Sequence, residues 1–204
     1  MKHSTAYQDL LEQMNATGRN KMDGYQEDLL DEVDDWERAK AEKLIWDAFN
    51  DENDVELAVL MPKLRQYDGV DALKKKLSKC PIPSYASVLV ARVLFEQTKE
   101  DNYFDLILEN IEKSNYNGEF VSMLVYYCTP CKRTYDAFKS IYLTCPNGKV
   151  RDDAVLGLLR HKGIIHDPRD LMEVFEQSEL TNKFVSEDAD ERARILEAFE
   201  VGTL

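Results

Sequence analysis

Residues 83–113 read PSYASVLVARVLFEQTKEDNYFDLILENIEK, and this stretch decides the fold class. Its apolar side chains recur every three or four residues, the period of an α-helix, and not every second residue as in a strand. Pro83-Ser84 is a typical helix start, and a partner helix is expected from about Asp101. The stretch therefore predicts a helical hairpin.

The same pattern occurs twice more along the chain. Asn117-Gly118 and Asn147-Gly148 are expected to open the next two pairs, so the approximate repeat units are 84–114, 118–145 and 148–178. Repeats of roughly 30 to 45 residues are typical of helical-hairpin arrays, in which each pair hides its apolar face by stacking on its neighbours.

The second helix of the third unit has the clearest predicted start. Asp167 would be its N-cap and Pro168 its first helical residue, with Leu171, Val174 and Phe175 on its apolar face.

The rest of the chain has helical periodicity too. Pro62 must kink or divide the helix in which it lies. Gly and Pro together are few, 8 and 6 of 204 residues. Further helices are expected after Ser4, from Asp23, from about Asp35, after Asp54, after Asp68-Gly69 and over about 191–199. We therefore predict one all-α domain over residues 1–204, an irregular HEAT-like stack of helical hairpins; the alternative is a single globular helical bundle.

The chain has no segment that resembles a membrane span or a secretory leader. The longest uninterrupted apolar run, 123–128, is far shorter than the roughly 18 residues that a spanning helix needs. The first nine residues contain no apolar core of a signal peptide. We expect a cytoplasmic protein that does not bind membranes, with Cys80, Cys128, Cys131 and Cys145 as reduced thiols.

The net charge of −13 is distributed unevenly. Residues 23–56 hold fourteen acidic and three basic residues, and residues 170–204 hold ten acidic and three basic. Residues 57–169 are slightly basic. Acidic segments repel the phosphates of nucleic acids, so the expected partner is a protein with a basic surface. The alternative is that the acidic faces only keep the protein soluble.

The predicted partner-binding residues lie in the acidic segment 23–56. Its Trp36, set among carboxylates, is either a packing anchor at a helix start or the centre of an interface with an acidic rim. The acidic residues are expected to face solvent, because other positions form the apolar stripes. The predicted set is Asp28, Asp31, Glu32, Asp34, Asp35, Trp36, Asp51 and Glu52.

One motif suggests redox chemistry. Tyr127-Cys128-Thr129-Pro130-Cys131-Lys132 resembles the Trp-Cys-Gly-Pro-Cys-Lys active site of the thioredoxin family, in which the first cysteine is nucleophilic. However, no strand pattern follows Cys145, and the alternative is two buried cysteines that flank a turn between helices. Cys128, Cys131, Cys145 and His161 lack the second close pair of a zinc site. We therefore predict no catalytic residues, no metal and no cofactor.

Part of the N-terminal region resembles a known family. The matching pattern is Trp36-Glu37-Arg38-Ala39-x-Ala41-Glu42, Ala48-Phe49, Leu60-x-Pro62-Lys63-Leu64 and Tyr67-Asp68-Gly69-x-x-Ala72-Leu73. It is similar to HEAT-like helical proteins of bacterial polymorphic-toxin loci, among them immunity proteins of contact-dependent growth inhibition systems.

The resemblance implies a function without catalysis. Such immunity proteins bind one toxin domain tightly and block its active site. Many of these toxins are nucleases with basic clefts, for which an acidic inhibitor is complementary. The leading hypothesis is thus an immunity protein that neutralises a cognate toxin; the alternatives are a general HEAT-like interaction scaffold and, third, a thiol oxidoreductase at Cys128 and Cys131.

Overall fold

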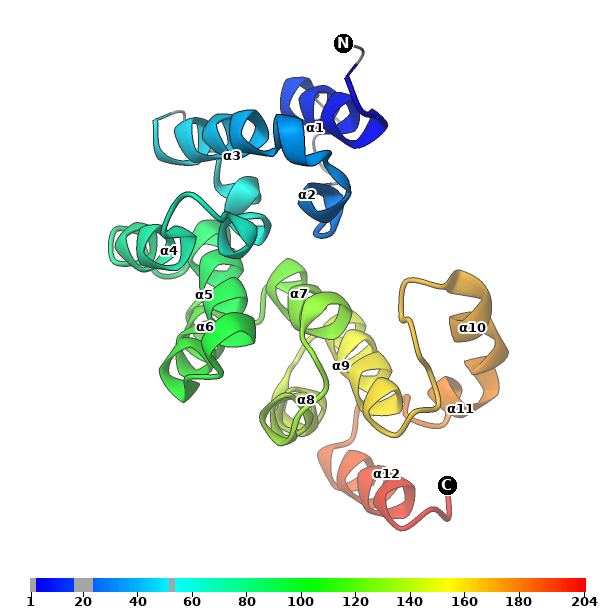
Figure 1. Ribbon diagram of the computed structural model, residues 1–204. Helices are drawn as coiled ribbons and strands as arrows, with labels where there is room; N and C mark the ends of the chain where they lie inside the picture. Colours follow the sequence, from blue (N-terminus) through cyan, green and yellow to red (C-terminus); the bar gives the residue numbers. More distant parts are fainter. Residues whose placement is uncertain (1–2, 17–23, 52–53) are drawn as a thin grey trace. The chain divides into compact units, whose positions relative to one another are not determined.

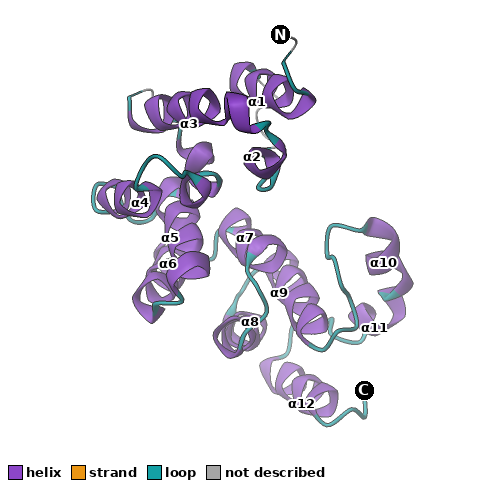
Figure 2. Cartoon of the chain, in the orientation of Figure 1, coloured by secondary structure: helices purple, strands orange, loops and turns teal. Residues whose placement is uncertain are grey.

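The computed structural model describes residues 3–16, 24–51 and 54–204. All regular secondary structure in these ranges is helical, which confirms the all-α prediction (Figures 1 and 2). The chain forms two compact units, residues 1–100 and 101–204. The single domain and the three repeat units stay predictions.

The first unit consists of short and long helices with two 3₁₀ segments. They are α1 (Thr5–Asn15), α2 (Leu29–Glu32), α3 (Asp35–Asn50), η2 (Val55–Val59), η3 (Met61–Lys63), α4 (Gly69–Leu77) and α5 (Tyr85–Thr98). Pro62 is the second residue of η3, and the two 3₁₀ segments meet at Leu60, so the predicted interruption is confirmed. The start predicted at Asp23 lies outside the described residues, and the helix that carries Leu29 and Leu30, α2, begins only at Leu29.

Side-chain caps set three helix starts in this unit. The side chains of Ser4, Asp68 and Ser84 accept hydrogen bonds from the amides of Tyr7, Asp71 and Ser87, respectively. Each bond satisfies an amide that has no partner inside its helix. The three starts were predicted correctly from the sequence, because a capping side chain and the amide that it binds lie only three residues apart.

Close packing in the first unit requires Gly69. A Cβ atom at this position would lie 1.9 Å from the carbonyl oxygen of Met61, which is backbone and cannot give way. Met61 itself is fully buried, together with Leu57 and Leu60. The glycine therefore lets the start of α4 approach η3 directly.

The second unit is built around α9. Its helices are α6 (Asp101–Lys113), α7 (Gly118–Tyr127), α8 (Lys132–Thr144), α9 (Gly148–His161), α10 (Leu171–Glu176), α11 (Ser178–Asn182) and α12 (Ala189–Glu200). Both α7 and α8 pack on α9, and α12 packs on α8. The starts predicted at Gly118 and Gly148 are confirmed.

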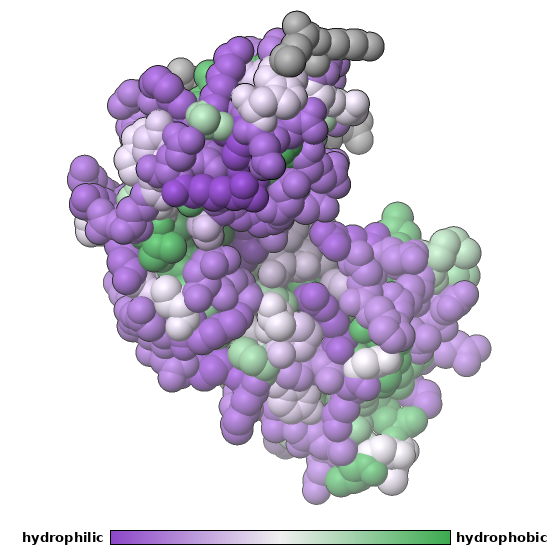
Figure 3. Space-filling view, viewed as in Figure 1, coloured by the Kyte–Doolittle hydropathy of each residue, from purple (hydrophilic) through white to green (hydrophobic). Residues whose placement is uncertain are grey.

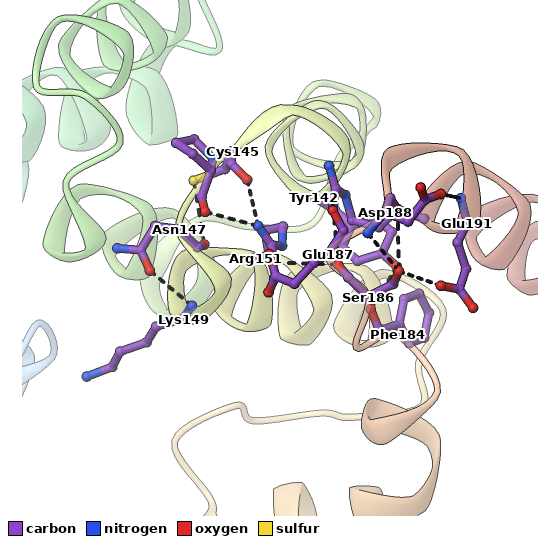
Figure 4. A network of polar contacts seen from close by, with 12 residues as sticks. Tyr142, Cys145, Asn147, Lys149, Arg151, Phe184, Ser186, Glu187, Asp188 and Glu191 are labelled. Atoms are coloured by element: carbon purple, nitrogen blue, oxygen red, sulfur yellow. Dashed lines mark hydrogen bonds and ion pairs between the residues drawn. The ribbon is translucent and has the colours of Figure 1, made fainter.

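Two buried arginines, Arg151 (labelled in Figure 4) and Arg192, anchor the segment between α11 and α12. Arg151 donates to the carbonyl of Cys145 at 3.0 Å and to the Glu187 carboxylate at 2.6 Å. Arg192 donates to the carbonyls of Glu187 and Leu143, each at 2.9 Å. Together they attach residues 184–188 to α8 and α9.

The predicted start at Asp167 is wrong. The Asp167 carboxylate accepts bonds from the backbone and side chain of Arg169, so it closes a turn instead of capping a helix. Asp170 caps α10, accepting from the amides of Met172 and Glu173. The apolar face predicted for this helix is not covered either, because Leu171 is 80% exposed.

Candidate partner-binding surface

The acidic side chains around Trp36 lie at the junction between α2 and α3. Asp31 and Glu32 end α2, Asp34 is the N-cap of α3, and Asp35 and Trp36 are its first residues. All five are exposed, as is Asp28. We call these six residues the acidic junction.

The other two predicted site residues do not belong to the junction. Asp51 follows the C-terminal end of α3 and is exposed. A helix of sixteen residues is about 24 Å long, so Asp51 lies far from Asp35 at its other end. Glu52 lies outside the described residues.

Trp36 lies at the protein surface and is not a core residue. Its side chain is 52% exposed. The indole nitrogen donates to the Asp34 carboxylate at 3.2 Å, and the ring stacks on His3 with centroids 6.3 Å apart. His3 in turn pairs with the buried carboxylate of Glu37, so the indole rests on a fixed support.

A buried ion pair beneath the junction fixes its backbone. In α3, Arg38 donates from Nε to Glu42 Oε1 at 2.7 Å, and from its other nitrogens to the carbonyls of Leu30 and Lys63. Arg38 thereby joins the end of α2, the start of α3 and the end of η3.

Glu42 completes this network on its other oxygen. Oε2 accepts from the amides of Arg65 and Gln66 at 3.0 and 2.9 Å. Burial alone raises the pKa of Glu42, but the hydrogen bonds from Arg38 and from the two amides outweigh it, and the pKa is lowered. The network therefore needs Glu42 ionised.

Basic side chains neutralise only part of the junction. Lys63 Nζ lies 2.5 Å from Asp31, and Arg65 lies 3.5 Å from Asp35. Among the described residues, no cation forms an ion pair with Asp28 or Glu32. The junction is therefore net acidic, with one large exposed aromatic ring at its centre.

The helix dipole accounts for part of this acidity. Carboxylates at the first turn of a helix are stabilised by its partial positive charge, which applies to Asp35 and Glu37 in α3. Asp31 and Glu32 gain little from it, because α2 is a single turn of four residues.

The cysteine motif spans the turn between α7 and α8. Cys128 is buried at the end of α7, and Cys131 is the half-buried N-cap of α8, where it forms a capping box with Thr134. Residues 120–125, whose sequence suits a strand or a helix equally well, lie in α7. The described residues therefore lack the sheet on which a thioredoxin site is built, and the four cysteines are thiols.

The described ranges contain neither a metal-binding cluster nor a membrane-spanning helix. No three His, Cys, Asp or Glu side chains come together there in a way that could hold a metal ion. No helix among those same residues is long and apolar enough to cross a membrane.

A pocket in the C-terminal unit was not predicted from the sequence. It has a volume of about 260 Å³ and lies between α9 and the α10–α11 segment, lined by Asp152, Asp153 and several valines. The sequence signal for it is the pair of adjacent carboxylates within α9, and such pairs are common in a chain with 39 acidic residues.

Comparison with known proteins does not add a relative: no family model, curated protein or solved structure matches this chain.

Proposed function

We propose that this chain is an immunity protein that binds and neutralises a toxin domain, a nuclease, through the acidic junction. The observation that carries the proposal is the exposed Trp36 ring within a rim of carboxylates. Interface hot spots are enriched in tryptophan and are surrounded by polar contacts that exclude water. An exposed tryptophan that stacks on His3, itself paired with the buried Glu37, is already positioned for such a contact.

The charge of the junction supports a basic partner. A nuclease cleft attracts phosphates with basic side chains, and an acidic inhibitor is drawn to the same field. Electrostatic complementarity of this kind mainly accelerates association and selects the partner. In this proposal the protein acts in the cytoplasm and has no catalytic role.

The test uses the protein encoded directly upstream of this chain's gene, where the toxin of an immunity protein is expected. The two purified proteins are mixed, and nuclease activity and the association rate are measured. We expect stoichiometric loss of nuclease activity, and an association rate that falls as salt rises, because salt screens charges beyond about 8 Å at physiological ionic strength.

A charge-matched pair of variants makes the test specific. Asp28→Lys, Glu32→Lys and Asp34→Lys combined should slow association at least about tenfold. Glu112→Lys, Glu119→Lys and Glu197→Lys combined change the net charge equally at exposed positions of the C-terminal unit and should have a small effect. Equal slowing by both sets would show that net charge, not the junction, governs binding.

A general HEAT-like scaffold is the second candidate, favoured by the hairpin packing of α7, α8 and α9. An upstream product that is no toxin, or that this chain does not inhibit, would exclude the immunity function and leave the scaffold.

A further inference from the structure

The helix α10 exposes its apolar side chains to solvent. Leu171, Met172 and Phe175 are 80%, 68% and 71% exposed, and no residue of α10 is buried. Green, hydrophobic side chains are visible on the surface over this segment in Figure 3. Exposing three large apolar residues on one short helix is unfavourable for solubility, so a covering partner would stabilise this face.

α10 is held in place although it buries little of itself. Asp170 caps it, and the Glu173 carboxylate accepts from the backbone amides of His166 at 2.8 Å and Asp167 at 2.9 Å. On the C-terminal side, the arginine network of Figure 4 attaches residues 184–188 to α8 and α9. The apolar side chains are thus presented on a fixed backbone.

The pocket beside α10 combines apolar walls with two carboxylates. Val155 and Leu156 of α9, Val174 of α10 and Val185 contribute the apolar side chains, and Asp152 and Asp153 lie at the α9 side. Its volume, about 260 Å³, is sufficient for one long side chain.

Arg151 and Lys149 act on Asp152 and Asp153, respectively, only at longer range than an ion pair. Within the described part of the chain, neither Asp152 nor Asp153 forms an ion pair. The neighbouring Arg151 is bound to Glu187 at 2.6 Å, and Asp153 accepts a hydrogen bond from the hydroxyl of Ser122. Burial raises the pKa of both carboxyls, so an added cation would stabilise their ionised form.

We propose that α10 and this pocket form a docking surface for a basic, amphipathic segment of a partner protein. Apolar residues of the segment cover Leu171, Met172 and Phe175, and a lysine or arginine enters the pocket. Its aliphatic stem contacts Val155, Val174 and Val185, and its charge meets Asp152 and Asp153. The inference does not depend on the identity of the partner or on the proposed function of the acidic junction.

The acidic charge of this surface favours a basic peptide over a second copy of the chain or an anionic membrane. Asp170, the N-cap of α10, Glu176 at its end and Glu179 in α11 are all exposed. A second copy of the chain would bring two such acidic faces together, and an anionic membrane would be repelled. A basic polypeptide meets both the apolar and the acidic part of the surface.

The test uses three helical peptides of sixteen residues and the full-length protein. One peptide combines leucine and lysine, one leucine and glutamate, and one serine and lysine. Binding is measured by calorimetry and located from amide shifts in NMR spectra. We expect the leucine–lysine peptide to bind with shifts in α9, α10 and α11, and the other two peptides to bind at least about tenfold more weakly.

Two variants and their matched controls separate the two parts of the surface. Leu171→Ser with Phe175→Ser, and Asp152→Asn with Asp153→Asn, should each weaken this binding about tenfold. Val201→Ser, at a residue that is 68% exposed, and Glu112→Gln with Glu119→Gln are the controls and should not change the affinity.

Several results would overturn the proposal. They are shifts confined to the acidic junction, equal binding of the leucine–glutamate peptide, and full affinity in either docking variant. The protein could also dimerise or bind neutral phosphatidylcholine vesicles. If the Leu171→Ser and Phe175→Ser changes abolish that association, the face has another occupant. Because no toxin is used, failure here leaves the proposed function untouched.

Discussion

Arg38 and Glu42 lie one turn apart in α3 and form a 2.7 Å ion pair in the interior of the first unit. Their side chains are 7% and 0% exposed. Besides each other, they bind two carbonyls and two amides of segments that are distant in sequence. A pair one turn apart on a helix is thus the point at which α2, α3 and the segment after η3 are joined.

Replacing Glu42 with Ala should destabilise the protein by about 3–5 kcal/mol, because Arg38 would remain buried without its counter-charge. Chemical denaturation measures the free energy of unfolding. Lys43→Ala is the matched control: it breaks the exposed i,i+4 pair between Lys43 and Asp47 in the same helix and should cost less than about 1 kcal/mol. Similar costs for the two variants would contradict a central role of the network.

The stability that Glu42 contributes should depend on pH. Its pKa is lowered in the folded protein from the ordinary value of 4.5, because the hydrogen bonds from Arg38 and two backbone amides outweigh burial. The contribution is therefore complete well above pH 4.5 and is lost as the pH falls through the folded pKa. The difference in unfolding free energy between the unmodified protein and Glu42→Gln, measured from pH 7 downward, should shrink in this acidic window. A difference that grows on acidification would reverse the sign and refute the assignment.

Gly157→Ala should destabilise the second unit by about 1–3 kcal/mol, even though alanine is the better helix former. A Cβ atom at this position would lie 2.5 Å from the ring of Phe138, which is itself buried in the contact between α8 and α9. Thermal unfolding provides the measurement. Gly118→Ala is the control, because its Cβ would be 3.6 Å from its nearest neighbour, an ordinary contact. Unchanged stability of Gly157→Ala would mean that the two helices can separate without cost.

Trp36→Ala should weaken binding of the upstream toxin by about 2 kcal/mol or more, the size of an interface hot spot, with most of the change in the dissociation rate. Because the ring is half exposed and rests on His3, the free protein should keep its fold and most of its stability. Trp46→Ala offers the comparison, since Trp46 stacks on Tyr67 at 4.7 Å and is only partly exposed. That change should lower stability more than affinity. The opposite ranking would place Trp36 among the packing residues.

Asp153→Asn should raise the melting temperature at neutral pH. Burial raises the pKa of Asp153, so its ionised form is disfavoured in the folded protein, and the cost appears as the pH rises through the folded pKa. Asparagine keeps an acceptor for the Ser122 hydroxyl without the charge. Thermal scans at pH 4 and pH 7 should show a gain only at the higher pH. A lower melting temperature at pH 7 would show that the charge is compensated within the protein.

Capping residues and apolar periodicity in the sequence predicted the helices, but not what packs against them. The caps at Ser4, Asp68 and Ser84 and the starts at Gly118 and Gly148 were predictable, because a cap and its amide lie within one turn. The exposure of the acidic junction was predictable too, since other positions form the apolar stripes of α2 and α3.

The error at Asp167 has a specific physical cause. Asp and Pro in succession are a good helix start, but the side chain of Asp167 had a closer alternative in Arg169. Whether Asp167 caps a helix or pairs with Arg169 depends on how the following residues are placed. Here the Glu173 carboxylate also accepts a hydrogen bond from the Asp167 amide and stabilises the turn.

The sequence by itself determined that this protein is helical, where most helices begin, and that its charge is concentrated in 23–56 and 170–204. These properties follow from period, capping and composition, which act over a few residues. Only the tertiary structure decided that Arg38 and Glu42 join three segments, that Trp36 stays at the surface, and that α10 exposes Leu171 and Phe175 beside a pocket with two carboxylates. Periodicity shows which side chains share a face of a helix, but what covers that face depends on contacts between residues far apart in the chain.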